Sequence, residues 1–143
     1  MTTAMYKTDF YGWTQRQASL LQNEDFAELD LPHLIEEIEA MGQNQRHALA
    51  SHLIGLLLHL LKYAYQPQRR TQSWLRGIDN HRTEIELILE YNHSLATELP
   101  DQLVYVYPKA RRKASKETGL AINHFPENCP WTSAQILDLD WLP

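Results

Sequence analysis

Residues 53 to 62, LIGLLLHLLK, form the stretch that most restricts how this chain can fold. Apolar residues recur around it at spacings of three and four, which is the period of a helix and not the alternation of a strand. The apolar stripe is so wide that a helix here has to be buried on most of its sides. We therefore predict a central helix that ends before Pro67, with its apolar positions at Leu49, Leu53, Leu56, Leu57, Leu60 and Leu61.

The rest of the chain carries the same helical period, with only five glycines and few runs of β-branched residues. Further helices are predicted from Thr8 or Asp9 to Asn23, from Asp30 into the central helix, from Ser73 to Tyr91 and from Pro100 to Gly119. The fold class that follows is all-α. We expect one antiparallel helical bundle of about four main helices, spanning residues 1–143 as a single domain.

Glycines and prolines set the expected irregularities. Gly42 is predicted to kink or break the helix that begins at Asp30, and Pro108 to bend the last long helix. After Gly119, a packed extended segment holds one short helix, capped by Thr132 with Gln135 three residues later. Side chains expected to face inward include Phe10, Trp13, Leu20 and Leu21 in the first helix and Phe125, Trp131, Ile136, Leu137 and Trp141 near the C-terminus.

Size and cysteine content indicate an ordinary intracellular domain. A chain of 143 residues buries roughly two thirds of its unfolded surface and needs no crosslinks. The single cysteine, Cys129, cannot form a disulfide within the chain, which fits a reducing compartment. The start of the sequence lacks the pattern of a signal peptide, and the longest apolar run is shorter than the roughly 20 residues that span a bilayer. We expect a soluble, cytoplasmic protein with no membrane segment.

Charge alternates along the chain in blocks. Net charge is −6 over residues 1–40, +5 over 41–82, −5 over 83–107, +4 over 108–120 and −3 over 121–143, which gives −5 in total. This balance argues against a protein that binds nucleic acid by electrostatics alone. Alternating signs suit a bundle whose neighbouring elements attract one another, although each exposed pair contributes only about 0–1 kcal/mol.

Several separate segments resemble a known bacterial family. They are TDFYGWTQRQASLL, LDLPHLIEEIEAMG, LLLHLLKYAYQPQRRTQSW, ARRKASKETGL and FPENCPWTSAQILD. Their order is that of a mainly cyanobacterial family known as domain-of-unknown-function family number 29, and the resemblance covers nearly the whole chain. It implies an all-α fold in a small intracellular protein and implies no activity. Pro108 departs from the helix-tolerant residue expected at its position.

His59 interrupts the leucine-rich run, and three roles are open to it: a structural residue bonded to a buried polar partner, a proton carrier or anion contact, and a metal ligand. His52 shares its helical face but lies two turns away, roughly 10.5 Å, which is too far for one zinc ion with Zn–N bonds of about 2 Å. A metal site would need carboxylates from other helices, such as Glu36, Glu39, Glu86 or Glu90. The one Glu-x-x-His pair is Glu90 with His93. The structural role is favoured, and neither a metal nor a cofactor is expected.

Basic and aromatic residues are interleaved between Lys62 and Arg76, an arrangement that can present cations and stacking faces to phosphates and bases. The candidate nucleic-acid or anion-binding residues are Lys62, Arg69, Arg70, Trp74 and Arg76. A second positive block holds Lys109, Arg111, Arg112, Lys113 and Lys116, and the two blocks would form one surface if they were adjacent. The alternative, which the charge balance favours, is that the arginines pair with Glu36, Glu37 and Glu39.

No complete catalytic set can be identified from the sequence. His59, Glu36 and Glu39 are weak candidates, because carboxylates near one helical turn are usually a solvated face. Cys129 has no local base and is interpreted as a packing residue. We expect a non-catalytic interaction or accessory protein with an unknown protein partner or with self-association. The alternative is a nucleic-acid-associated protein, including an RNA-processing enzyme, that uses the segment from Lys62 to Arg76.

Overall fold

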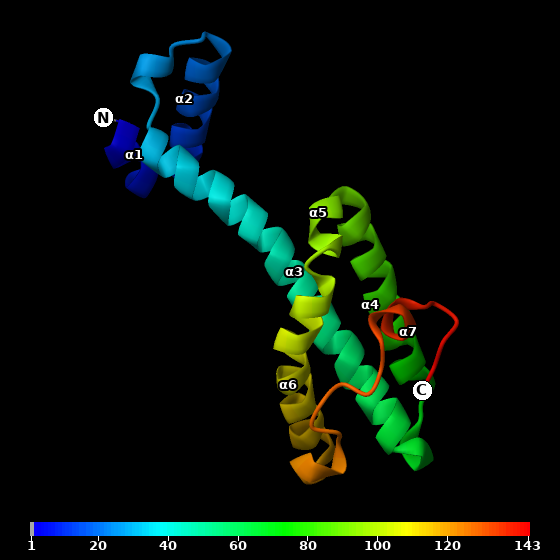
Figure 1. Cartoon of the computed structure of the whole chain (residues 1–143). Coiled ribbons are helices and arrows are strands. Elements are labelled where there is room, and N and C mark those ends of the chain that lie inside the picture. The colour runs from blue at the N-terminus through cyan, green and yellow to red at the C-terminus, as the bar shows by residue number, and fades with distance from the viewer. Residues whose placement is uncertain (1) are drawn as a thin grey trace. The chain divides into compact units, whose positions relative to one another are not determined.

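The computed structural model describes residues 2–143 and is built from helices (Figure 1). The α-helices are α1 (Thr2–Thr8), α2 (Phe10–Gln22), α3 (Leu31–Tyr65), α4 (Gln72–Tyr91), α5 (His93–Ala96), α6 (Leu99–Thr118) and α7 (Ser133–Leu137). Short 3-10 turns are η1 (Phe26–Glu28), η2 (Pro67–Arg69) and η3 (Ile122–His124). The described residues contain no strand, so the predicted all-α class is confirmed. Helices α1 and α5 were not predicted.

The chain divides into two compact units within α3. The first unit, Met1–Asn44, holds α1, α2, η1 and the start of α3. The second unit, Gln45–Pro143, holds the rest of α3 and all later elements. The predicted span of one domain over residues 1–143 therefore stays a prediction.

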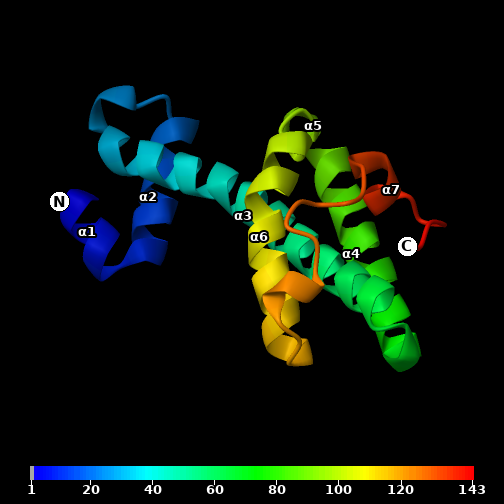
Figure 2. The same ribbon diagram turned by 60° about the horizontal axis from the view of Figure 1, so that its bottom comes forward.

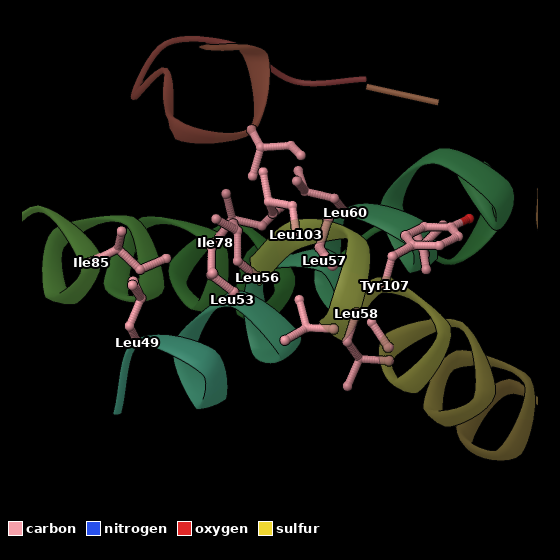
Figure 3. Packing of buried hydrophobic residues seen from close by; sticks show 14 of the residues in the cluster. Leu49, Leu53, Leu56, Leu57, Leu58, Leu60, Ile78, Ile85, Leu103 and Tyr107 are labelled. Atoms are coloured by element: carbon pink, nitrogen blue, oxygen red, sulfur yellow. The ribbon is translucent and has the colours of Figure 1, made fainter. Parts of the chain in front are cut away.

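The core of the second unit is built around the leucine-rich half of α3. In Figure 2, α4 and α6 lie along this half of the helix, and the close view in Figure 3 shows its leucines meeting Ile78 and Ile85 of α4 and Leu103 and Tyr107 of α6. All six leucines predicted for the central helix are fully buried. Phe125 and Ile136 are buried in the same core, so the C-terminal segment packs on the helices as expected.

The first unit buries fewer of its apolar residues. Trp13 and Leu20 of α2 are buried as predicted, but Phe10 and Leu21 are about half exposed, and for these two the prediction is wrong. The unit has few elements with which to cover α2, so only one edge of the predicted stripe is enclosed. The start of α3 also keeps an exposed apolar row, formed by Leu31, Ile35, Ile38 and Met41.

Helix ends follow local sequence rules. Asp9 caps α2 by accepting the Gly12 N–H, Gly119 ends α6 in the left-handed conformation at φ 75°, and Thr132 with Gln135 forms a capping box on α7. The expected break at Gly42 is wrong, because α3 runs through it without interruption. One glycine costs a helix only about 1 kcal/mol, which its helix-forming neighbours outweigh. Helix α6 is likewise continuous through Pro108.

Helix α3 is long and apolar enough to cross a membrane by length and composition. The leucines responsible for this are enclosed by α4, α6 and the C-terminal segment, as in the core helix of a helical bundle. The apolar character of α3 is therefore explained by the burial of its leucines in the core of the second unit.

Candidate functional site

The two positive segments meet at one end of the second unit, which we call the basic end. Lys62, in the last turn of α3, places its Nζ 2.8 Å from Oε1 of Glu117, in the last turn of α6. The same Nζ lies 6.0 Å from the ring centroid of Trp74, in the first turn of α4. Lys62 thus contacts the start of α4 and the end of α6. Lys62 and Glu117 are 55 residues apart in the sequence, and no local pattern predicted their contact.

The connection between α3 and α4 presents three arginines at this end. Arg70 donates from Nε to the carbonyl of Tyr63 at 2.9 Å, and its guanidinium carbon lies 4.1 Å from the Tyr63 ring centroid. This folded-back position preorganises the side chain through a cation–π contact. Arg69 and Arg76 are exposed, on η2 and on the first turns of α4.

Helix α6 adds a second row of cations beside an exposed aromatic ring. Tyr105 is 65 % exposed, and the Nζ of Lys109 lies 4.9 Å from its ring centroid. Arg111 donates to the carbonyl of Phe125 at 3.2 Å and so is partly used in holding the C-terminal segment. The exposed cations on the last turns of the helix are Arg112, Lys113 and Lys116.

The arginines of the basic end have no ion-pair partner within the second unit. Among the described residues of that unit, the ion pairs join Arg46 to Glu98 and Lys62 to Glu117, and neither involves Arg69, Arg70 or Arg76. Glu36, Glu37 and Glu39 belong to the first unit, so their pairing with these arginines stays a prediction. An exposed pair of this kind contributes only about 0–1 kcal/mol.

His59 borders the basic end without joining its charge. Its ring is half-buried on α3, with Nδ1 buried and without a hydrogen-bond partner in the described chain. The expected buried polar partner is therefore absent. Burial, and after it the charge of Lys62, lower the pKa of His59 below its usual value. Because its lowered pKa favours the neutral imidazole, His59 contributes no fixed positive charge to the basic end.

The weak catalytic set is not assembled within either unit. Glu36 and Glu39 are exposed on the part of α3 that belongs to the first unit, whereas His59 belongs to the second. Glu37 accepts a hydrogen bond from the Tyr6 hydroxyl, which raises the pKa of Tyr6 to about 12. Within the described part of either unit, His59, Glu36 and Glu39 therefore form no acid–base pair.

A polar network around Asp30 was missed by the sequence reasoning. Its Oδ2 accepts Trp13 Nε1–H at 3.0 Å and lies 2.8 Å from His33 Nδ1, while its backbone N–H donates to Gln17 at 2.9 Å. Tyr6 stacks on His33 with ring centroids 3.9 Å apart. The spacing of an aspartate and a histidine three apart at a predicted helix start was the available signal. The network ties α1 and α2 to the start of α3, which is a structural role.

Two hollows lie elsewhere in the second unit. One, of about 450 Å³, is lined by residues that include Tyr107, Pro108 and Cys129. Burial raises the pKa of the Cys129 thiol, whose sulfur contacts the Trp131 carbonyl at 3.5 Å, and this favours the packing role. The other, of about 360 Å³, is lined by Arg82, Ile85, Glu86, Leu89, Glu90, His93 and Leu137. No group of three metal-ligating side chains is assembled among the residues that the structure describes.

Comparison with known proteins gives one match. The family described as "Domain of unknown function DUF29" matches residues 5–142, which is nearly the whole chain. No curated protein matches the sequence. No solved structure matches it either.

Proposed function

From the premise that this chain belongs to the family "Domain of unknown function DUF29", whose description names no activity, we propose that it is a non-catalytic accessory protein that binds single-stranded nucleic acid at its basic end. The observation that carries this proposal is the contact between the two positive segments, made by Lys62 and Glu117. It joins the ends of α3 and α6, which carry cations of the two segments, and Arg69, Arg70 and Arg76 have no carboxylate partner within the second unit.

The aromatic rings among the cations favour single-stranded nucleic acid over polyanions that offer no bases for stacking. Arg70 lies over Tyr63 at the end of α3, and on α6 Lys109 lies over Tyr105, so each positive segment holds one cation–aromatic contact. A single strand offers phosphates to the cations and unstacked bases to the exposed ring of Tyr105. Residues 1–44 hold eight acidic and only two basic side chains, whereas residues 45–143 hold ten acidic and eleven basic ones.

The test is equilibrium binding of a fluorescently labelled oligouridylate to the full-length chain, measured by anisotropy over a range of salt concentrations. A strand that contacts three to five phosphates gives a slope of log K against log salt of about −2 to −3.5. Replacing Arg69, Arg70 and Arg76 together by alanine should flatten the slope by up to about 2. The three side chains are exposed, so folding is retained.

Arg16→Ala is the matched control, because Arg16 is an exposed arginine of the first unit. Its slope and affinity should equal those of the unaltered chain. Absence of binding at about 50 mM salt would overturn the proposal, as would binding that the triple substitution leaves intact.

A second candidate function, self-association, is supported by an exposed apolar row on α3 in the first unit. The aromatic C-terminal segment is largely packed on its own core, whereas Leu31, Ile35, Ile38 and Met41 are each more than half exposed at helical spacing. An apolar row of this kind fits a contact with the same row of a second copy. Light scattering should show a dimer that Ile35→Glu with Ile38→Glu converts to a monomer. A monomer at every concentration would remove this candidate.

We also propose a cytoplasmic location. The support is the unpaired Cys129, which fits a reducing compartment, and the enclosure of the apolar face of α3 within the second unit. Fractionation of cells that express the full chain should place it in the soluble fraction, and recovery with membranes would contradict the location.

A further inference from the structure

Three half-buried histidines lie along the interface of α3 and α4, and we call them the histidine cluster. His52 and His59 come from α3, and His81 comes from α4. The ring centroid of His81 is 5.3 Å from that of His52 and 5.7 Å from that of His59. His81 therefore lies beside both histidines of the opposite helix, although these two are about two turns apart along α3.

Two glycines leave room for rings of the histidine cluster against the opposite helix. A Cβ added at Gly55 of α3 would lie 2.4 Å from Nε2 of His81, and one added at Gly77 of α4 would lie 2.6 Å from Nε2 of His59. Side-chain carbons do not approach ring atoms so closely. Each ring therefore packs directly against the backbone of the opposite helix, so a change in its charge acts on the interface itself.

The contact between His52 and His81 depends on their protonation. Their Nδ1 atoms are 3.0 Å apart, which is the distance of a hydrogen bond in which one ring donates and the other accepts. A neutral imidazole has one N–H and one acceptor nitrogen, whereas a protonated imidazole has two N–H groups and no acceptor. The bond can therefore form while at least one of the two rings is neutral, and it is lost when both are protonated.

His59 is also poorly placed to carry a second proton. Its Nδ1 is buried without a hydrogen-bond partner among the described residues. In the protonated ring this atom would be a buried donor without an acceptor, which destabilises the charged form. A proton on His59 would also place a positive charge beside His81, and like charges at this separation repel one another.

Burial is the largest cause that lowers the pKa of both His59 and His81. At His59 the charge of Lys62, on the same helix, lowers the pKa further. At His81 the charges of His52 and His59, from the opposite helix, have the same effect. The neutral form of each ring is thus favoured by its surroundings while α3 and α4 are packed together.

Two carboxylates act in the opposite direction. Glu84 of α4 raises the pKa of His81, and Glu117 of α6 raises that of His59. Glu84 is exposed, so solvent screens its charge. Glu117 already pairs with Lys62 at 2.8 Å, so its charge is largely compensated. Neither carboxylate outweighs burial, and the net direction at both histidines is downward.

We propose that the histidine cluster is a pH-sensitive switch, which holds α4 on α3 while its rings are neutral and loosens this interface when neighbouring rings take up protons. The switch lies wholly in the second unit and does not depend on nucleic-acid binding at the basic end.

The direction of the pH dependence follows from the proton balance. The pKa values of His59 and His81 are lower in the folded chain than the ordinary value of 6.5. Below pH 6.5 the opened chain therefore binds more protons than the folded chain, and acid favours opening. The interface is most stable well above this pH and is weakened as the pH falls.

The test is urea unfolding of the full-length chain, followed by circular dichroism between about pH 8 and pH 5. The unfolding equilibrium constant should rise below pH 6.5 by up to about tenfold per pH unit for each additional proton bound. Hydrogen exchange, corrected for the intrinsic effect of pH, should show that amides of α4 lose protection at about pH 5. Amides of α2, in the first unit, should not lose protection.

Asparagine variants test the cluster itself, because asparagine offers a polar atom near the position of Nδ1 but does not titrate in this range. His52→Asn and His81→Asn should each reduce the pH dependence of unfolding. His52→Asn keeps the test decisive if His81→Asn fails to fold. His47→Asn, which replaces an exposed histidine of the same helix, is the matched control and should keep the full pH dependence.

Three results would overturn the proposal. One is an unaltered chain that is as stable at about pH 5 as at about pH 8. Another is a pH dependence that His52→Asn leaves unchanged or that His47→Asn removes. The third is protection of the α4 amides that does not decrease in acid.

Discussion

Gly42, Gly55 and Gly77 look alike in the sequence, but at the scale of single residues they occupy different surroundings. A Cβ at Gly42 would meet no atom within 4 Å, whereas a Cβ at Gly55 or Gly77 would collide with an imidazole ring. All three glycines lie in helices, where glycine is about 1 kcal/mol less favourable than alanine. At Gly55 and Gly77 the absence of a Cβ leaves room for the rings of His81 and His59, and this packing offsets the lower helix propensity of glycine.

Alanine substitution should therefore separate the three positions. Gly42→Ala should raise the free energy of unfolding by about 0.5–1 kcal/mol, because it gains helix propensity at no steric cost. Gly77→Ala should lower it by about 1–3 kcal/mol, because the His59 ring has to leave its place. Urea unfolding followed by circular dichroism measures both values. A gain from Gly77→Ala equal to that from Gly42→Ala would show that the ring moves freely.

Asp30 should give the first unit a dependence on acid. Burial alone would raise the pKa of Asp30, but hydrogen bonds from His33 and Trp13 outweigh it and bring the pKa below the ordinary value of 3.8. A carboxylate with a lowered pKa contributes stability above pH 3.8, and this contribution is lost as the pH falls through the folded value.

Asp30→Asn should lower stability at pH 7 by about 1–2 kcal/mol and remove the part of the acid dependence that lies below pH 3.8. The indole N–H resonance of Trp13, whose proton is donated to Asp30, reports on this site directly. Asp25→Asn alters an exposed aspartate of the same unit and should change neither quantity. An unchanged acid dependence in Asp30→Asn would contradict the assignment.

At the scale of elements, a buried arginine adds hydrogen bonds between α4 and the C-terminal segment. Arg82 of α4 is 3 % exposed and donates from Nε to the carbonyl of Ile136 at 2.8 Å and from Nη2 to that of Gln135 at 3.4 Å. Both carbonyls belong to α7, so the guanidinium donates to acceptors at a helix end. The contact fixes α7 on α4.

Arg82→Met should cost about 2–3 kcal/mol of unfolding free energy, because it keeps much of the side-chain volume and leaves both carbonyls without a charged donor. Residues 121–143 should then be cut by protease before the helices are. Arg76→Met, an exposed change on the same helix, should stay within about 0.5 kcal/mol of the unaltered chain. Equal stability of the two variants would mean that apolar packing alone holds the segment.

At the scale of the whole molecule, the two units differ in how much apolar surface they bury. The first encloses Trp13 and Leu20, whereas the second encloses the leucines of α3 together with residues from α4, α6 and the C-terminal segment. Local stability follows buried apolar contacts, so the first unit should open more readily than the second. Helix α3 contributes residues to both units, so the local stability of the two units can be compared within one helix.

Hydrogen exchange on the full-length chain should show this difference. Amides of α2 and of residues 31–43 should exchange at least about tenfold faster than those of residues 49–61, a difference of about 1.4 kcal/mol. Mass spectrometry of peptides from the exchanged protein measures it. Equal protection in both halves of α3 would show that residues 1–143 open as one cooperative domain, as the sequence led us to expect.

Sequence patterns were enough to predict the long helices, the ends of several of them and the buried face of the central helix, but not the short helices α1 and α5. These depend on periodicity and on residues a few positions apart, such as Asp9 with Gly12 and Thr132 with Gln135, so local physics suffices. The burial of Phe10 and Leu21 was predicted wrongly, because it depends on whether other elements cover α2. The break at Gly42 was predicted wrongly, because the cost of one glycine in a helix was overestimated.

Which polar groups meet depends on how the helices pack, and sequence patterns did not reveal it. The sequence supplied Lys62, His52 and His81 but could not place Lys62 beside Glu117 or His52 beside His81, because those distances depend on how separate helices pack. It also could not tell that Gly55 and Gly77 admit rings or that the arginines make no ion pair within the second unit. Contacts between residues far apart in the chain are set by the shape of the core, whereas helix formation is set by near neighbours.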